Sequence, residues 1–123
     1  MSDERRTRQE PGCGALILFV LLAAACGGSV DCPNDLPASC PSPMPSYQNG
    51  VRPIIQAYCL KCHSPGGQEA TIDFTSHQNV FTQRGPILTQ IYSCRMPLAG
   101  EATPTTQERA TFLGWLVCGS PNN

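Results

Sequence analysis

Apolar side chains recur at helical spacing in two parts of the chain. The first set comprises Val51, Ile54, Ile55, Tyr58 and Cys62. Intervals of three and four positions place these residues on one face of a helix. Pro53 suits the first turn, where its missing N–H costs nothing, and Asn49 or Gly50 is the expected cap. The helix should end at residues 64–67, a Ser-Pro-Gly-Gly sequence that stops helices.

The second set lies near the C-terminus and consists of Phe112, Leu113, Leu116 and Val117, with Trp115 at the edge of the stripe. Thr105 and Glu108 form a capping-box pattern before it. In this pattern the threonine oxygen caps a backbone N–H and the glutamate reaches back. Gly119 is the expected helix stop. This is the clearest helix in the sequence.

The region between the two helices has a weaker pattern. We expect short helical turns over residues 75–81 and 87–92, separated by a break at Gly85-Pro86. No alternating run is long enough for a strand. The pattern therefore predicts an all-α domain.

An uninterrupted apolar run at residues 15–25 precedes this domain. It is shorter than the ~20 residues that cross a bilayer, and it stands where the core of a signal peptide belongs. Residues 22–26, Leu-Ala-Ala-Ala-Cys, resemble the lipobox of bacterial lipoproteins, although Ala23 stands where leucine is most common. The resemblance implies cleavage before Cys26 and a lipid on that cysteine. Ordinary secretion, with Cys26 in a disulfide, is the alternative.

These features divide the chain into a signal peptide at 1–25, a tether rich in Pro, Gly and Ser at 26–46, and a helical domain at 47–121. Gly27 is not the aspartate that retains some lipoproteins in the inner membrane, so an outer-membrane anchor is expected. The formal net charge is −1 and no basic patch is present, which argues against nucleic acid as a partner.

Cys59, Cys62 and His63 form the Cys-x-x-Cys-His pattern of c-type haem attachment. On one helical turn the two thiols can add to the two vinyl groups of a haem, and the next imidazole then points at the iron. Other interpretations are a reactive cysteine pair, half of a zinc site, or two unrelated disulfides. Zinc needs four ligands, but no second Cys-x-x-Cys exists and His77 is the other histidine. We therefore expect one covalent haem c, which fits export because disulfides and thioether attachment belong outside the cytoplasm.

Met96 is the expected second axial ligand of the haem iron. Its thioether is a soft neutral ligand that raises the reduction potential opposite histidine. Met1 and Met44, the other methionines, fall in the signal peptide and the tether. The alternatives are that Met96 only fills a gap in the core, or that His77 is the ligand and gives a lower-potential haem.

The chain has eight cysteines. Cys13 falls in the signal peptide, Cys26 is the lipid candidate, and two cysteines are assigned to the haem. Four remain, which are Cys32, Cys40, Cys94 and Cys118. An even remainder in an exported chain implies two disulfides. We expect Cys32–Cys40 and Cys94–Cys118, because each pair lies within its own segment.

Five short sequences together resemble a small class I-type cytochrome c domain. They are Val51-x-Pro53-Ile54, Cys59-x-x-Cys62-His63, Cys94-x-Met96-Pro97-x-x-Gly100, Glu108-Arg109 and Trp115-Leu116-Val117-Cys118-Gly119. The sequences are more similar still to the short cytochrome-like domains on exported lipoproteins of Gram-negative bacteria, including myxobacteria and planctomycetes. The resemblance implies helices at both ends of the domain that cross beside the haem, with His63 and Met96 as axial ligands. Leu98 departs from the family, which often has a second proline there.

The expected function is electron transfer by a haem c carrier, not an enzyme, anchored by lipid in the periplasm or on the outer membrane of a Gram-negative bacterium. Its partners would be redox proteins that the sequence does not identify. One alternative is a haem subunit of a larger redox enzyme, with an open sixth position on the iron. The other is a haem-free structural lipoprotein held together by disulfides.

Overall fold

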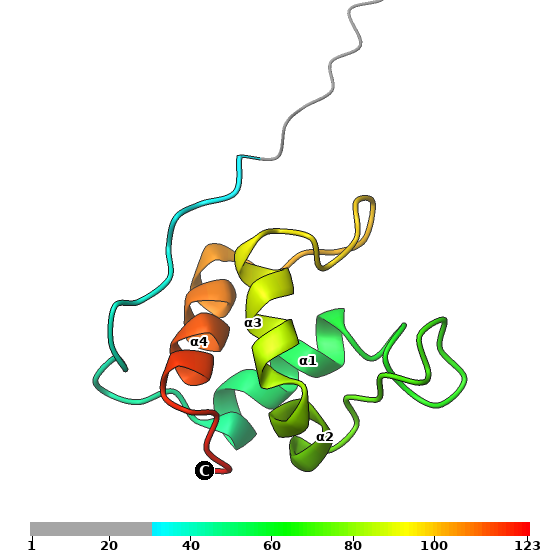
Figure 1. Cartoon of the computed structure of the whole chain (residues 1–123), viewed down its shortest axis with the longest axis horizontal. Coiled ribbons are helices and arrows are strands. Elements are labelled where there is room, and N and C mark those ends of the chain that lie inside the picture. The colour runs from blue at the N-terminus through cyan, green and yellow to red at the C-terminus, as the bar shows by residue number, and fades with distance from the viewer. Residues whose placement is uncertain (1–30) are drawn as a thin grey trace, which may run out of the picture.

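The computed structural model describes residues 31–123, and these residues are helical without strands (Figure 1). The elements in chain order are the π-helical turn η1 (Tyr47–Val51), α1 (Arg52–Tyr58), α2 (His77–Thr82), α3 (Arg84–Tyr92) and α4 (Thr106–Val117). The all-α prediction is confirmed. The predicted signal peptide and the lipidation candidate Cys26 lie outside the described residues. Within residues 31–123 no helix is long and apolar enough to cross a membrane.

The first helical unit begins earlier than the sequence suggested. Its cap is Ser46, whose hydroxyl accepts the backbone N–H of Asn49 at 3.3 Å, so the prediction of Asn49 or Gly50 as the cap is wrong. The difference arises because η1 adds a wide turn in which Gly50 and Val51 both donate to the Ser46 carbonyl. Pro53 occupies the first turn of α1, as expected. The helix ends at Tyr58, immediately before the paired cysteines.

The two short helices α2 and α3 meet at Gln83 and not at Gly85-Pro86, so the predicted break is misplaced by two residues. Pro86 lies in the first turn of α3, where its missing N–H removes no helical hydrogen bond. The prediction took Gly-Pro as an interruption, but here it starts a helix.

Helix α4 has the predicted capping box. Thr105 Oγ1 accepts from Glu108 N at 3.2 Å, and Glu108 Oε2 accepts from Thr105 N at 2.8 Å. Gly119 ends the helix with a φ of +85°, a conformation that glycine adopts without strain. Trp115 is fully buried and not at the edge of the stripe, because the chain after α4 folds back and Pro121 O accepts its indole N–H at 2.9 Å.

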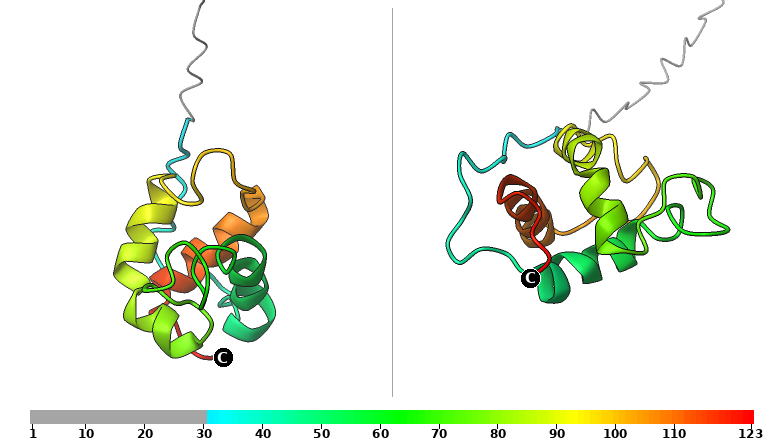
Figure 2. Two further views of the ribbon diagram at one scale, coloured as in Figure 1. Left: turned by 90° about the vertical axis from the view of Figure 1, so that its right-hand side faces the viewer. Right: turned by 60° about the horizontal axis from the view of Figure 1, so that its bottom comes forward.

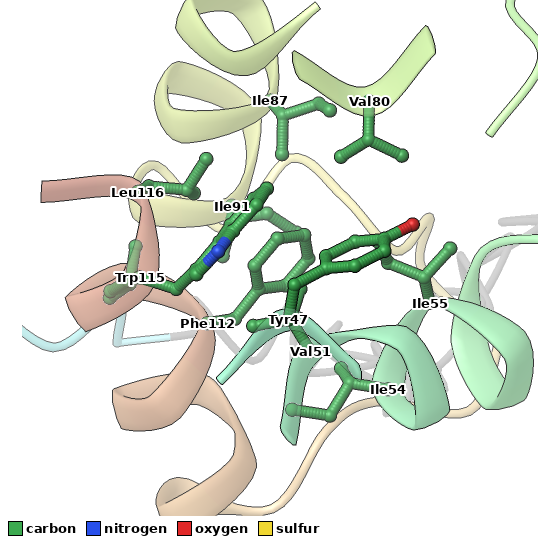
Figure 3. Close-up of a cluster of buried hydrophobic side chains, with 11 residues drawn as sticks. Tyr47, Val51, Ile54, Ile55, Val80, Ile87, Ile91, Phe112, Trp115 and Leu116 are labelled. Carbon is green, nitrogen blue, oxygen red and sulfur yellow. The ribbon is translucent and has the colours of Figure 1, made fainter. Parts of the chain in front are cut away.

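All the helical elements contribute to one core (Figure 3). Its buried members are Tyr47, Val51, Ile54, Ile55, Val80, Ile87, Ile91, Phe112, Leu113, Trp115 and Leu116. The N-terminal unit contacts α4 mainly through η1, while α3 packs on α4 and α2 packs on α3. Figure 3 shows Tyr47 and Val51 beside Phe112 of α4.

Residues 31–46, hereafter the strap, have no regular secondary structure but are fixed to the helices. In Figure 1 they pass along the outer side of α4. The Asp35 carboxylate accepts two hydrogen bonds from Arg109 of α4, at 2.7 and 2.9 Å. At Gly114 a Cβ atom would lie only 2.9 Å from Pro41 Cγ, so the close approach of strap and helix requires glycine. This part of the predicted tether therefore packs as part of the domain.

The four remaining cysteines form two disulfides, as expected, but the predicted pairing is wrong. The bonds are Cys32–Cys94 and Cys40–Cys118, and both join the strap to the helical domain. The strap runs beside α4 from its beginning to its end, so Cys32 and Cys40 lie at opposite ends of that helix. A disulfide needs Cα atoms within about 7 Å, which excludes pairing between neighbours in the sequence here.

Candidate functional site

An apolar cavity of about 210 Å³ lies between the end of α1, one face of α3 and the loop that follows α3. Cys59 and His63 line it from one side, and Met96 lines it from the loop after α3. Phe74, Ile87 and Ile91 supply much of its apolar wall. Three of the four residues predicted to hold a haem therefore face one cavity, although they are up to 37 positions apart in the sequence.

The segment 59–63 folds as a tight turn that continues α1. Cys59 N donates to Ile55 O at 2.9 Å, and His63 N donates to Cys59 O at 2.9 Å. His63 thus follows Cys59 by about one helical turn. Cys62 is partly buried beside the cavity but is not among the residues that line it. Gly67 packs so closely on this turn that a Cβ atom would lie 2.3 Å from Cys62 O.

Cys59 and Cys62 are both free thiols. Burial, and to a lesser extent the neighbouring Cys62, raises the pKa of the Cys59 thiol to about 11. A thiol with a raised pKa stays protonated at neutral pH and is a poor nucleophile for disulfide exchange. This environment argues against Cys59 as the attacking thiol of a reactive redox pair.

The His63 imidazole is held in one orientation. Its Nδ1 lies 3.0 Å from Ile72 O, and a carbonyl can only accept, so Nδ1 carries the proton. Phe74 stacks on the ring with centroids 4.5 Å apart, and Phe74 N donates to His63 O. In the neutral ring with the proton on Nδ1, the lone pair is on Nε2. A fixed Nδ1–H to a backbone carbonyl is the arrangement that orients metal-binding histidines.

Met96 lies at the start of the loop 95–104, which joins α3 to α4. The backbone N–H groups of Arg95 and Met96 both donate to Gln90 O, at 3.0 and 3.2 Å. Two residues earlier, Cys94 is fixed by its disulfide to the strap. Met96 is partly buried and packs against the core. Its thioether therefore borders the cavity on a backbone that is anchored to the end of α3 and, through Cys94, to the strap.

His77, the alternative sixth ligand, is at a different place. Its Nε2 lies 3.0 Å from Ser120 O, and its ring packs edge-on against Tyr47 and Trp115. It does not line the cavity. These contacts connect α2 to the C-terminal segment and give His77 a structural place in the fold.

Several residues of the cavity wall are not among the residues predicted for the site. Phe74 was missed because it lies in an irregular segment. Gln83, Ile87 and Gln90 were missed although they lie on one face of α3 at intervals of three and four. That helical spacing was a usable signal. Tyr58 also lines the cavity, and its hydroxyl donates to Glu108 Oε2 at 3.0 Å, which connects the end of α1 to the start of α4.

Within residues 31–123 no three His, Cys, Asp or Glu side chains converge in a way that could hold a metal ion. The zinc interpretation of the paired cysteines therefore lacks further ligands in this part of the chain. Comparison of the chain with family models, with curated proteins and with solved structures gives no match.

Proposed function

We propose that this protein transfers electrons through one haem c bonded to Cys59 and Cys62, with His63 and Met96 as the axial ligands. One observation carries the proposal. A fixed imidazole, a free thiol and a thioether from two separate segments border the same apolar cavity. The resemblance of the sequence to small cytochrome c domains supports the same conclusion.

The residues of the cavity fit such a group in three respects. A porphyrin ring is largely apolar, and the wall is made mainly of apolar side chains such as Phe74, Ile87 and Ile91. The thiols of Cys59 and Cys62 are not in disulfides, although the other four cysteines among residues 31–123 are. The His63 Nε2 is free to act as a ligand because Nδ1 is occupied by Ile72 O.

A bound haem would supply a one-electron couple, and the protein would tune it. Met96 opposite His63 would raise the reduction potential. The hydrogen bond from Nδ1 to Ile72 O would keep the proton on that nitrogen and hold the plane of the ring. The apolar walls would keep water away from the ring. With both axial positions taken by side chains, no position would remain for a substrate, so we infer a carrier and not an enzyme.

The two disulfides indicate an oxidising, exported environment. We propose that the protein reaches this environment as a lipoprotein anchored through Cys26, in the periplasm or on the outer membrane. Its electron donors and acceptors would be other redox proteins.

The test is expression of the full chain in bacteria that have a cytochrome c maturation system. We expect coloured protein, a haem stain that survives a denaturing gel, and a mass increased by one haem. Cys59→Ala and Cys62→Ala should lose the covalent stain. His77→Ala should keep it, because His77 lies away from the cavity. Colourless protein without the added mass would refute the proposal and leave the haem-free structural lipoprotein.

A further inference from the structure

One ion pair joins the two segments that carry the proposed axial ligands. Lys61 lies inside the turn formed by Cys59 to His63. Its Nζ contacts Glu101 Oε1 at 2.8 Å and Oε2 at 2.6 Å. Glu101 belongs to the loop 95–104, which contains Met96 near its start. We propose that Lys61 and Glu101 are positioning residues that hold this loop closed over the cavity and so keep Met96 on the iron. The inference rests on the haem proposed above.

The loop has few other attachments between its ends. Its start is held by the hydrogen bonds of Arg95 and Met96 to Gln90 O, and its end by the capping box of α4. In between, Glu101 N donates to Leu98 O, but that bond lies within the loop. The Leu98 side chain is 53% exposed and packs little.

The ion pair is therefore the contact that joins the loop 95–104 to the turn formed by Cys59 to His63. Among residues 31–123 no other hydrogen bond connects the two segments. In Figure 2 the loop after α3 and the turn after α1 lie on the same side of the molecule. If the pair breaks, Met96 is still anchored at its own backbone, but the rest of the loop is free to move away.

The expected effect is modest and sensitive to salt. The Lys61 and Glu101 side chains are 70% and 38% exposed, so water and ions screen their attraction. An exposed pair of this kind changes an equilibrium by about two- to fivefold. The Lys61–Glu101 ion pair, hereafter the clasp, should therefore alter how often Met96 leaves the iron, but Met96 should bind with or without it.

The experiment measures the rate at which imidazole replaces Met96 in the oxidised, haem-loaded full chain. Imidazole is suitable because it is largely uncharged at pH 8 or above and can bind only after the sulfur leaves. We expect Glu101→Gln to accelerate replacement by about two- to fivefold at low salt. The wild-type rate should rise with added sodium chloride, and the Glu101→Gln rate should not.

Two further variants make the result specific. Glu69→Gln removes the same charge from an exposed carboxylate that makes no ion pair among the described residues, so its rate should match the wild type. Lys61→Glu alone places a second carboxylate beside Glu101, so it should accelerate replacement at least as much as Glu101→Gln. The exchanged pair Lys61→Glu with Glu101→Lys should return the rate toward the wild-type value.

Equal rates in wild type and Glu101→Gln would overturn the clasp, and so would equal acceleration by Glu69→Gln. In either case a visible haem spectrum would leave the proposed function standing. Protein without haem would refute the proposed function instead. In that case amide hydrogen exchange over residues 97–104 still tests the contact. It should be faster in Glu101→Gln than in wild type, and equal exchange would overturn it.

Discussion

Met96 and His77 are the two side chains that the sequence offers as a sixth ligand, and their surroundings differ. Met96 borders the same cavity as His63, whereas His77 is hydrogen-bonded to Ser120 O and packed against Trp115. A residue that already has a structural partner must break that contact before it can bind iron. At the residue scale the geometry therefore favours Met96.

If the proposed haem is bound, replacing Met96 should change the coordination of the iron, whereas replacing His77 should lower the stability of the protein. We expect Met96→Ala to abolish the weak long-wavelength absorption band of methionine-bound ferric haem and to lower the reduction potential. His77→Ala should keep the band and destabilise the protein by about 1 kcal/mol or more, through loss of a part-buried hydrogen bond and ring packing. Visible spectra and urea denaturation measure both effects. The reverse pattern would assign the ligand to His77.

The strap and α4 act together at the scale of elements. Arg109 donates to Asp35 and also to the carbonyls of Ile91 and Tyr92, so one guanidinium connects the strap, α4 and the end of α3. The hydrogen bonds from Arg109, and to a lesser extent its charge, lower the pKa of the Asp35 carboxyl. A carboxyl with a lowered pKa stabilises the fold where it is ionised and loses that effect on protonation.

Asp35→Asn should therefore cost stability in a way that depends on pH. Near neutral pH we expect the free energy of unfolding to fall by about 1 kcal/mol, a value that allows for screening of a partly exposed pair. The wild-type advantage should shrink as the pH drops from about 4, the ordinary range of aspartate, through the lower folded pKa. Urea denaturation at several pH values measures this. Asp31→Asn is the matched control, since Asp31 is exposed and makes no ion pair among the described residues; the same loss there would contradict the role of Asp35.

How far the sequence predicts each element depends on how local its determinants are. The α4 capping box and the Gly119 stop were predicted correctly because they involve neighbours in the chain. The Ser46 cap was missed because a π-helical turn has no clear sequence signal. The cavity residue Phe74 lies in an irregular segment, and its place in the wall depends on how segments pack. No local pattern shows that packing, although the Cys-x-x-Cys-His pattern itself was visible in five residues.

At the scale of the whole molecule, the disulfide pairing also depends on contacts between distant segments. Proximity in the sequence suggested pairs within segments, but the path of the strap along α4 brings distant cysteines together. Each bond closes a large part of the chain, with separations of 62 and 78 residues. Cross-links over loops of that size stabilise by about 4 kcal/mol each on the chain-entropy model.

The pairing can be checked on unreduced protein cut with trypsin and with a protease that cleaves before aspartate. Asp35 separates Cys32 from Cys40, so the two bonds fall in different products. Trypsin does not cleave before Pro53, so we expect residues 31–34 joined to 85–95 and residues 35–61 joined to 110–123. Peptide 31–34 joined to 35–61 would instead support the pairing of Cys32 with Cys40. Replacing Cys40 and Cys118 together by alanine should lower the free energy of unfolding by about 4 kcal/mol.

The bond between Cys32 and Cys94 has a consequence for the proposed electron carrier. It attaches the strap two residues before Met96, and only five residues separate Cys32 from Cys26. A fully stretched chain of that length reaches about 20 Å. With a lipid on Cys26 and the proposed haem in place, the domain would be held on a short tether, and the part of it that contains Met96 would lie close to the bilayer. Such a carrier would exchange electrons with neighbours in the same membrane, and a freely diffusing protein would have to come to that surface to meet it.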